Sequence, residues 1–302
     1  MKNLCKIIVT TAIALLVTCM ISSCHKPDYN PEKKISKIYT SSQYILMGDV
    51  VQESPKLLQE EWIWDKNKLT TINIEGGKID FIYDKQNYLT EIDYYGGMER
   101  ILFKYKNKQL HQILIQEVGF TYISIDVTKI DNKQITEMSM EFVGGSKNKN
   151  ALHISDVISP ISRYLFPQAI SEVLSTSIKN MMNKNEEKIL GNMVITLNIS
   201  YSGDNISSII QTNNYYEDES GITMYKYDKM NNPFYKSFLY GMDNTFLTSK
   251  NNITQIEYSS EDPQNYTYKY DGEWPVEQIR TYVYGYWDTE IVIYTTYYEY
   301  QN

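Results

Sequence analysis

The chain has 302 residues, a net charge of −8 at neutral pH and 28 tyrosines. This length allows a substantial core in one large or two small domains. The modest acidic excess, without clustered Lys and Arg, argues against binding to DNA or RNA. Tyrosine favours strands and tolerates half-buried positions with its hydroxyl in water, so we expect sheets with one solvent-exposed face.

The N-terminal segment has the features of a secretion signal. Lys2 and Lys6 supply positive charge, and residues 7–21 form a mostly apolar stretch without charged residues. A membrane-spanning helix needs about 20 largely apolar residues, so this stretch is short for a span. Its length and flanks are typical of a signal peptide.

The end of the apolar stretch predicts a lipid anchor. Ser22 and Ser23 precede Cys24, and this pattern resembles the lipobox of bacterial lipoproteins. The resemblance implies that residues 1–23 are a lipoprotein signal peptide and that acyl chains are attached to Cys24. Each buried CH₂ contributes about 0.8 kcal/mol, so several chains anchor a protein stably where one does not. An ordinary signal peptide with a coincidental cysteine is the alternative.

Residues 24–34 are expected to form a tether. Two prolines there oppose regular structure. Cys5 and Cys19 lie in the segment that is removed, which leaves no pair for an intramolecular disulfide. His25 stands where an aspartate retains many lipoproteins at the inner membrane. We therefore expect an outer membrane lipoprotein, on the periplasmic face or at the cell surface.

The body of the chain, residues 35–302, is built on a recurring unit. An aromatic strand and a polar turn are followed by a second strand with apolar residues at fixed offsets, as Trp64 is followed by Leu69 and Ile72. The other clear units are Tyr83 before Leu89 and Ile92, Tyr105 before Leu110 and Ile113, Ile130 before Ile135 and Met138, and Tyr201 before Ile206 and Ile209. The turn residues accept tight or left-handed geometry, which indicates hairpins.

Alternation and glycine pairs extend this interpretation. Apolar residues alternate with polar ones from Met193 to Tyr201, a strong strand signal. Glycine pairs at 76–77, 96–97 and 144–145 are typical of the opposite turns of a meander. We predict a mainly β fold with a single long, strongly curved antiparallel sheet. It would be a meander of hairpins, an open or partial barrel, with one helical insert.

The helical insert is expected at about residues 155–190. Apolar residues recur there at helical spacing: Ile170, Val173, Leu174, Ile178, Met181 and Met182. Pro167 precedes them and Gly191 ends the run, as in an amphipathic helix. We expect this helix to cover one face or open end of the sheet; a helix that binds a partner or a membrane is the alternative.

Several short motifs resemble a known family. They are Tyr83-Asp84, Tyr227-Asp228, Tyr270-Asp271, Asn231-Asn232-Pro233-Phe234-Tyr235 and Ser249-Lys250-Asn251-Asn252-Ile253-Thr254. They look like uncharacterised Bacteroidetes lipoproteins whose domain of unknown function is described as porin-like. The resemblance covers most of residues 35–302 and implies a curved antiparallel sheet without assigned catalytic residues. The YD-type repeats also resemble the wraps of Rhs-type secreted toxins, whose repeats are more regular and glycine-rich.

An integral membrane barrel is the alternative to a lipid-anchored domain. Such a barrel presents an apolar band to lipid, flanked by aromatic girdles. Here Lys104, Lys226 and Lys269 stand between aromatic residues in the middle of expected strands. Charged residues at these positions argue against a lipid-facing surface, so we expect a domain outside the bilayer.

The sequence carries no recognisable catalytic or metal-binding signature. His25, His111 and His153 lie far apart, and neither HExxH, GxSxG nor a glycine-rich phosphate loop is present. Adjacent acids such as Glu60 and Glu61 are interpreted as solvated residues and not as a glycosidase pair. We therefore expect no enzymatic activity, no cofactor and no metal.

The functional expectation is a lipid-anchored, non-catalytic envelope protein with a binding or scaffolding role. Glycan binding is one alternative, because aromatic residues gather near the C-terminus: Tyr266, Tyr268, Tyr270, Trp274, Tyr282, Tyr284, Tyr286 and Trp287. Flat rings stack on sugars, although a packed tyrosine ladder would give the same pattern. Carriage of an apolar ligand in a half-barrel closed by the helix is the other alternative, and it requires an open apolar cavity.

Overall fold

The computed structural model describes nine ranges of the chain: residues 31–94, 96–117, 119–132, 134–143, 194–214, 221–235, 249–259, 262–284 and 290–301. These ranges contain strands and turns, and no helix. The strands are β1 (Ile35–Leu46), β2 (Asp49–Glu53), β3 (Leu57–Asp65), β4 (Lys68–Ile74), β5 (Gly77–Tyr83), β6 (Leu89–Tyr94), β7 (Glu99–Lys106), β8 (Gln109–Glu117), β9 (Phe120–Asp131), β10 (Gln134–Phe142), β11 (Val194–Ser202), β12 (Asn205–Asn213), β13 (Gly221–Asn231), β14 (Asn251–Tyr258), β15 (Gln264–Asp271), β16 (Trp274–Tyr284) and β17 (Glu290–Tyr300). The helix expected at about 155–190 lies outside the described residues.

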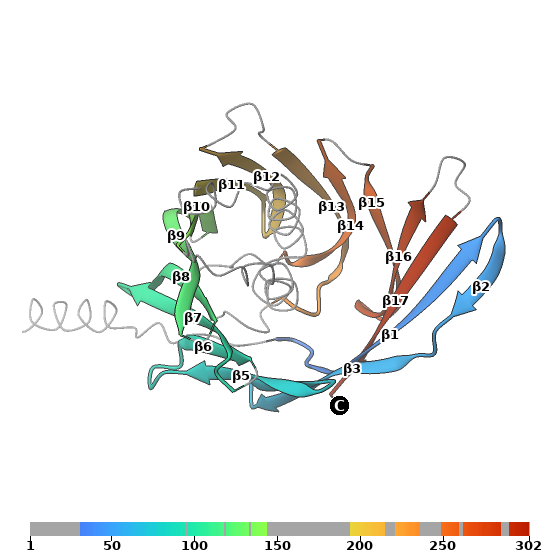
Figure 1. Ribbon diagram of the computed structural model, residues 1–302, viewed down its shortest axis with the longest axis horizontal. Coiled ribbons are helices and arrows are strands. Elements are labelled where there is room, and N and C mark those ends of the chain that lie inside the picture. The colour runs from blue at the N-terminus through green and yellow to red at the C-terminus, as the bar shows by residue number, and fades with distance from the viewer. Residues whose placement is uncertain are drawn as a thin grey trace, which may run out of the picture.

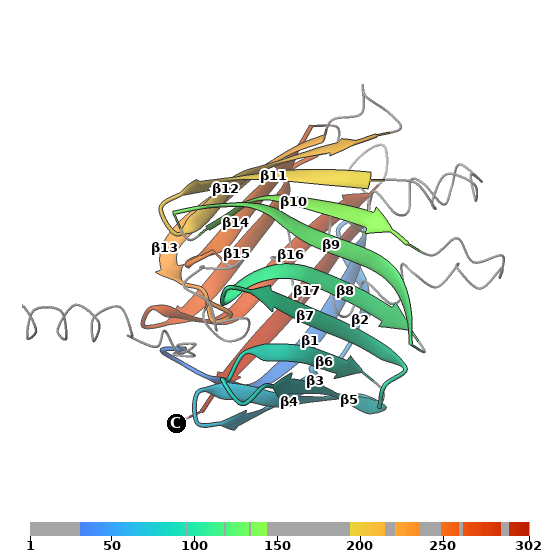
Figure 2. The same ribbon diagram turned by 90° about the vertical axis from the view of Figure 1, so that its left-hand side faces the viewer.

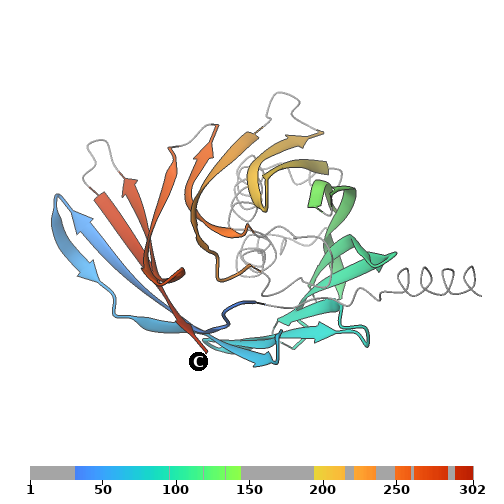
Figure 3. The same cartoon turned by 180° about the vertical axis from the view of Figure 1, so that it is seen from behind.

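The strands form one antiparallel sheet that closes on itself. Successive strands pair from β3 to β17, and β17 returns to β1, with Ile35 opposite Tyr300 and Leu46 opposite Glu290. On its other side β1 pairs with both β2 and β3, which share one position in the ring. Figure 1 and Figure 3 show β1 and β17 side by side from opposite directions.

The result is a closed 16-stranded barrel, which confirms a mainly β, antiparallel fold. The expectation of an open or partial barrel is wrong. Hairpin signals are local, whereas closure depends on pairing between the first and the last strand. No periodic pattern within a strand reveals that pairing.

The turns alternate between two rims. We call the rim at which β1 begins and β17 ends the proximal rim, and the other the distal rim; β6, β8 and β10 all end at the distal rim, opposite the C-terminus (Figure 2). Proximal turns place polar residues in the left-handed region, such as Asn107 (φ 54°) and Lys108 (φ 63°). Glycines occupy this region at both rims, as at Gly203 (φ 62°) in a proximal turn and at Gly76 (φ 78°) and Gly96 (φ 66°) in distal turns. The last two confirm two of the three predicted glycine turns. The pair at 144–145 lies outside the described residues.

Contacts across the ring identify the inner face of the sheet. Phe234, in the turn after β13, lies 6.0 Å between ring centroids from Trp62 of β3 and 5.9 Å from Tyr298 of β17. These strands do not neighbour β13 in the sheet, so their side chains meet inside the barrel. Trp62 and Tyr298 are buried and belong to a single core cluster with the other buried apolar residues. The buried face is therefore the inner face.

The apolar residues of the repeat form the aliphatic part of this core. Leu69 and Ile72 of the first unit are fully buried. The equivalent residues of the other units are at most 1 % exposed: Leu89, Ile92, Leu110, Ile113, Ile135, Met138, Ile206 and Ile209. Burial of such a side chain contributes about 1.5–3 kcal/mol. The fixed offsets in the sequence are thus the positions at which each second strand enters the core.

The aromatic residue of each unit has a different structural role. The ladder between β4 and β5 ends with Thr71 opposite Asp80, which leaves the carbonyl of Leu69 beyond the last pair. Tyr83, three positions past Asp80, donates its hydroxyl to that carbonyl at 2.6 Å. The phenol therefore supplies the donor that the backbone ladder no longer provides.

The same bond recurs around the barrel, and we call it the aromatic clamp. It joins Tyr105 to Leu89, Tyr201 to Ile135, Tyr268 to Ile253 and Tyr300 to Pro275, and the indole N–H of Trp64 to Ile35. In every case the acceptor lies two positions and the aromatic three positions beyond the last ladder pair. The six clamps tie most neighbouring hairpins together, which gives the tyrosine repeat a structural explanation.

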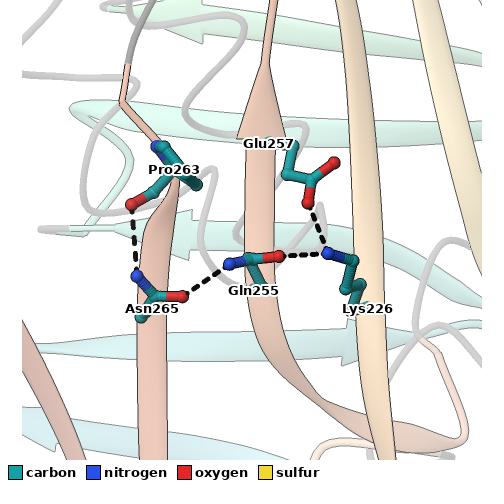
Figure 4. Close-up of polar contacts among 5 residues, drawn as sticks. All are labelled: Lys226, Gln255, Glu257, Pro263 and Asn265. Atoms are coloured by element: carbon teal, nitrogen blue, oxygen red, sulfur yellow. Dashed lines mark hydrogen bonds and ion pairs between the residues drawn. The ribbon is translucent and has the colours of Figure 1, made fainter.

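The outer face carries many charged and polar side chains, with a few exposed apolar ones such as Ile63 and Ile82 between them. Figure 4 shows a ladder across β13, β14 and β15, with the opposite wall of the barrel behind these strands. Lys226 contacts Gln255 and Glu257 at 2.5 Å each, Gln255 donates to Asn265 at 2.8 Å, and Asn265 donates to the carbonyl of Pro263 at 3.4 Å. Exposed bonds of this kind contribute little to stability, but they keep this surface hydrophilic.

The lysines that argued against a membrane barrel lie on this outer face. Lys104 is exposed, Lys226 pairs with Glu257, and Lys269 pairs with Glu277 at 2.7 Å. An apolar inner face and a charged outer face are the reverse of the arrangement in membrane-spanning barrels. Within the described ranges, no helix is long and apolar enough to cross a bilayer.

Candidate binding surface

The three tyrosines of β15 point into the barrel. Tyr266 is 3 % exposed. Tyr268 donates to the carbonyl of Ile253 and accepts a bond from Gln278, both at 2.8 Å, and burial raises its pKa. Its ring stacks on that of Tyr270, with centroids 5.9 Å apart. These rings are packed into the wall, so they offer no flat exposed platform to a sugar.

Tyr270 connects two of the YD-type units. Its hydroxyl donates to the carboxylate of Asp228, at the end of β13. Asp228 also accepts the backbone N–H of Met230 at 2.9 Å and of Asn252 at 3.2 Å. Burial raises the pKa of the Tyr270 phenol, and the bond to Asp228 and its negative charge raise it further. Tyr270 therefore stays a neutral donor to a charged acceptor.

The two asparagine-rich motifs meet at the same place. Asn252 donates its amide to the carbonyl of Asn231 at 3.1 Å, and Asn232 donates to the carbonyl of Ser249 at 2.9 Å. Ser249, only 2 % exposed, donates to the hydroxyl of Tyr227 at 2.7 Å. We call this set, with Asp228 and Tyr270, the polar knot. Its groups bond to one another, which indicates a structural role.

The polar knot lies at the shortest ladder of the sheet. Strands β14 and β15 pair at only two positions, Gln255 with Asn265 and Ile256 with Gln264. Nearer the proximal rim their backbones carry no ladder pairs, and the bond from Tyr270 to Asp228 passes over β14 to join β15 directly to β13. The motifs that resemble the porin-like family thus close the barrel wall where the ladder is interrupted.

A more accessible surface lies on the inner faces of β16, β17 and β1, toward the distal rim. Tyr294 is 48 % exposed and stands in register between Ser42 of β1 and Arg280 of β16. In the next row, Tyr44 and Tyr282 flank the same position of β17. Tyr294 shares its face with the buried Tyr298 by strand alternation, so the row faces inward. We call these five residues, Ser42, Tyr44, Arg280, Tyr282 and Tyr294, the tyrosine wall.

The rings of the tyrosine wall are held in fixed geometry. The Arg280 guanidinium lies 4.3 Å from the ring centroid of Tyr282 and 5.7 Å from that of Tyr266. Tyr282 and Tyr294 meet edge to face at 89°, with centroids 5.7 Å apart. Cation–π contacts of this kind contribute about 0.5–2 kcal/mol. The wall combines flat rings, hydroxyls and one cation, which suits a polar ligand with an apolar face.

The described aromatic residues that the sequence suggested as ligand contacts lie in different parts of the barrel. Tyr282 belongs to the tyrosine wall. Trp274 packs edge to face on Tyr300 near the proximal rim, with centroids 6.1 Å apart. The side chain of Tyr284, the residues Tyr286 and Trp287, and the expected lipidation site Cys24 lie outside the described part of the chain.

Sequence reasoning missed Tyr44, Arg280 and Tyr294. Alternation in the last strand, where Tyr294 and Tyr298 fall on one face, was the available signal. The exposure of Tyr294 depends on what packs against that face, and alternation does not contain this information.

The acidic pair at the start of β3 is divided between the two faces. Glu60 is 3 % exposed and accepts the indole N–H of Trp62 at 2.9 Å. Glu61 accepts an amide N–H from Asn73 at 3.3 Å. Adjacent strand residues point to opposite faces, so these carboxylates cannot act together on one bond. No group of three or more His, Cys, Asp or Glu gathers as a metal site among the described residues.

Comparison with known proteins gives structural similarity alone. No protein-family model and no curated protein matches the chain. Similar solved structures include a porin-like protein from Bacteroides uniformis, 12 % identical with a TM-score of 0.35 over 88 % of this chain and 98 % of that one. A porin-like protein from Bacteroides vulgatus is 10 % identical, with a TM-score of 0.44 over 89 % and 99 %.

A third similar structure is the complex TcdB2-TccC3-Cdc42, 8 % identical with a TM-score of 0.31 over 80 % of this chain but only 12 % of that one. Two of these three similar structures are thus porin-like proteins of Bacteroides. At these identities and TM-scores the similarities carry no argument about function, which must come from the residues of this chain.

Proposed function

We propose that this chain is a lipid-anchored, non-catalytic protein of the outer membrane with a binding role. The observation that carries the proposal is the polarity of the barrel. Its outer face bears charged residues such as Lys226 and Lys269 in the middle of strands, and its buried apolar cluster faces inward. A bilayer does not hold such a barrel by its wall, so membrane attachment requires a separate anchor. The lipobox-like sequence at Cys24 would provide one.

Replacement of the anchoring cysteine tests this proposal. We expect that cells expressing the Cys24→Ala chain incorporate no labelled palmitate into it, whereas the matched Cys19→Ala chain is labelled like the wild type. The reason is that Cys24 is the only thiol left after removal of residues 1–23. Palmitate on the Cys24→Ala chain would contradict the proposal.

The proposed location has its own test. His25 in place of an inner-membrane retention aspartate supports sorting to the outer membrane. Membrane fractionation should place the wild-type chain there, and recovery with the inner membrane would contradict this location. Protease treatment of intact cells separates a periplasmic face from surface display.

We place the ligand contact at the tyrosine wall, where inner-facing residues are exposed. The inner-facing side chains of β4 to β12 are buried and not accessible to a ligand, as shown by Ile72, Ile101 and Ile113, each 0 % exposed. Inner-facing Tyr294, in contrast, is nearly half exposed. A filled aliphatic wall argues against carriage of an apolar ligand along β4 to β12, so native mass spectrometry is expected to find no co-purified lipid.

Glycan binding is the candidate that the chemistry of the tyrosine wall favours. Aromatic rings stack on the apolar faces of sugars, while hydroxyls and a guanidinium bond to their oxygens. We expect that Tyr294→Ala and Arg280→Ala each weaken binding to a glycan-array hit by about tenfold, the effect of one lost contact of ~1.4 kcal/mol. The control is Tyr39→Ala, since Tyr39 lies on the outer face beside Lys56. An array without hits, or equal binding by all variants, would count against glycan recognition.

A further inference from the structure

Large apolar side chains stand exposed around the distal rim. Met47, in the turn between β1 and β2, is 80 % exposed, Met98 before β7 is 63 % and Phe120 at the start of β9 is 72 %. Val143 after β10 and Val283 near the end of β16 are each 51 % exposed. All of these positions lie at the same rim, because alternate turns of an antiparallel barrel fall at alternate ends.

The proximal rim has the opposite character. Its short hairpin turns, where the structure describes them completely, contain only polar residues and glycine: Lys66-Asn67, Asp84-Lys85-Gln86-Asn87, Asn107-Lys108, Gly203-Asp204 and Gly272-Glu273. The longer connection after β13 differs, because it carries Phe234, which packs into the core. The barrel is therefore polarised along its axis, with hydrophilic turns at the end where β1 begins and apolar tips at the other.

The spacing of the apolar tips indicates what they contact. Met98 and Phe120 lie on either side of β8, since Glu99 pairs with Glu117 and Glu117 pairs with Phe120, whereas Met47 lies in the β1–β2 turn, several strands farther around the ring. The core of a protein interface is a contiguous, close-packed patch, which separated tips do not form. A bilayer surface, in contrast, accepts protruding apolar side chains at any spacing in its headgroup and acyl boundary. We propose that the distal rim docks reversibly on a lipid surface through these tips.

The charged residues near the apolar tips indicate which lipid headgroups the rim should prefer. Asp49 follows the Met47 turn, Glu141 precedes Val143, and both are exposed. Arg100 is a cation close to Met98. Acids close to a membrane are repelled by anionic headgroups. The rim should therefore favour lipids with zwitterionic headgroups, such as phosphatidylcholine, over anionic ones.

This inference goes beyond the covalent anchor proposed above. The anchor would reach the barrel at the proximal rim, whereas the apolar tips are at the distal rim. Residues 24–34 span at most about 40 Å when extended. A strand the length of β1, 12 residues, also spans about 40 Å. The tether is therefore long enough for one membrane to hold both the acyl chains and the distal rim.

Vesicle binding by a chain that lacks residues 1–24 tests the rim without the anchor. All described strands lie within residues 35–300, so the barrel stays whole. This chain contains no cysteine, which allows single labels. An environment-sensitive fluorophore on Phe120→Cys should brighten and shift to the blue with phosphatidylcholine vesicles. The same fluorophore on Ile82→Cys, on the outer wall of β5, should not change.

Sedimentation with vesicles gives the second readout. We expect the triple variant Met47→Ser, Met98→Ser and Phe120→Ser to bind phosphatidylcholine vesicles at least about tenfold more weakly than the unsubstituted chain. The matched control is Ile63→Ser with Ile82→Ser, which removes two exposed side chains of the outer wall.

Three outcomes would overturn the inference. They are no vesicle binding by the unsubstituted chain, equal binding by the triple variant, and a doubled mass without vesicles that the triple variant abolishes. The last would mean that the rim joins two copies of the chain. Because this chain lacks Cys24, these results are independent of palmitate labelling.

Discussion

Tyr83 and Tyr105 perform the same structural task at two neighbouring hairpins. Each donates its hydroxyl at 2.6 Å to a carbonyl that lies beyond the end of a backbone ladder. Without the phenol, that carbonyl would be buried and unpaired, which costs about 1–3 kcal/mol. The repeated tyrosines therefore stand where neighbouring strands diverge, and their hydroxyls bind the backbone there and not a ligand.

Removal of one clamp hydroxyl should be measurable. We expect Tyr105→Phe to lower the free energy of unfolding by about 1–2 kcal/mol, because the carbonyl of Leu89 loses its donor while the ring stays packed. Urea unfolding measures the change. Tyr39→Phe is the control, since the Tyr39 hydroxyl makes only an exposed 3.3 Å bond to Glu299. Equal effects at both positions would contradict the clamp.

The clamps also predict an alkaline limit to stability. Burial raises the pKa of Tyr83, Tyr105 and Tyr201 well above the usual 10. In the unfolded chain these phenols ionise near pH 10, while in the barrel they stay protonated. The folded state then holds more protons, so the free energy of unfolding is intact below pH 10 and falls above it. Each such tyrosine adds about 1.4 kcal/mol per pH unit to the slope.

Urea midpoints between pH 9 and pH 11 measure this slope. Tyr105→Phe should reduce it by about one proton, because phenylalanine cannot ionise. A slope identical to that of the unsubstituted chain would show that Tyr105 ionises alike in the folded and unfolded states.

At the scale of elements, strand pairing is uneven around the ring. Strand β1 pairs with β17 along almost its full length, whereas β14 and β15 share two residue pairs. The polar knot joins β13 to β15 at this place, through Asp228 and Tyr270. The sheet thus replaces backbone bonds by side-chain bonds where one strand turns away from its neighbour.

The knot should be sensitive to loss of its central carboxylate. We expect Asp228→Ala to lower the free energy of unfolding by about 3 kcal/mol, because the hydroxyl of Tyr270 and the backbone N–H groups of Met230 and Asn252 lose a charged acceptor. Chemical unfolding measures it. The control is Asp271→Ala, which removes the exposed aspartate of the corresponding unit and should change stability by less than ~0.5 kcal/mol.

At the scale of the whole molecule, the ring brings the two ends of the barrel domain together. The backbone N–H of Gln301 donates to the carbonyl of Lys34 at 2.8 Å, next to the pair of Ile35 and Tyr300. Joined ends and a closed wall leave few strand edges for aggregation. The buried apolar cluster faces inward, and charged residues such as Lys226 and Lys269 lie on the outer face of this closed wall.

Circular permutation tests this closure. A chain in which a short glycine-serine linker joins residue 301 to residue 34, with new ends opened at Gly76 in a distal turn, should fold with a melting temperature within a few degrees of the original. A permutant opened between Ser41 and Ser42 should not fold, because it divides the strand that closes the ring. Unfolding of the first permutant, measured by circular dichroism, would contradict the closed topology.

The sequence alone determined the hairpins, their turns and the face that each strand buries. Leu69 and Ile72 could be assigned to the core, and lysines such as Lys104 to a hydrated face, because alternation and turn chemistry act over a few residues. The aromatic of each unit was found in the same way, although its clamp was not.

Only the tertiary structure decided how these hairpins are assembled. Closure pairs Ile35 with Tyr300, and the polar knot joins Asp228 to Tyr270 across 42 positions. The exposure of Tyr294 likewise depends on which parts of the inner wall are covered. Contacts between distant segments arise from the curvature of the entire sheet, which is the sum of many small strand twists. No pattern within one strand contains the total curvature of the sheet. The ring and the exposure of its surfaces can therefore be seen only in the complete structure.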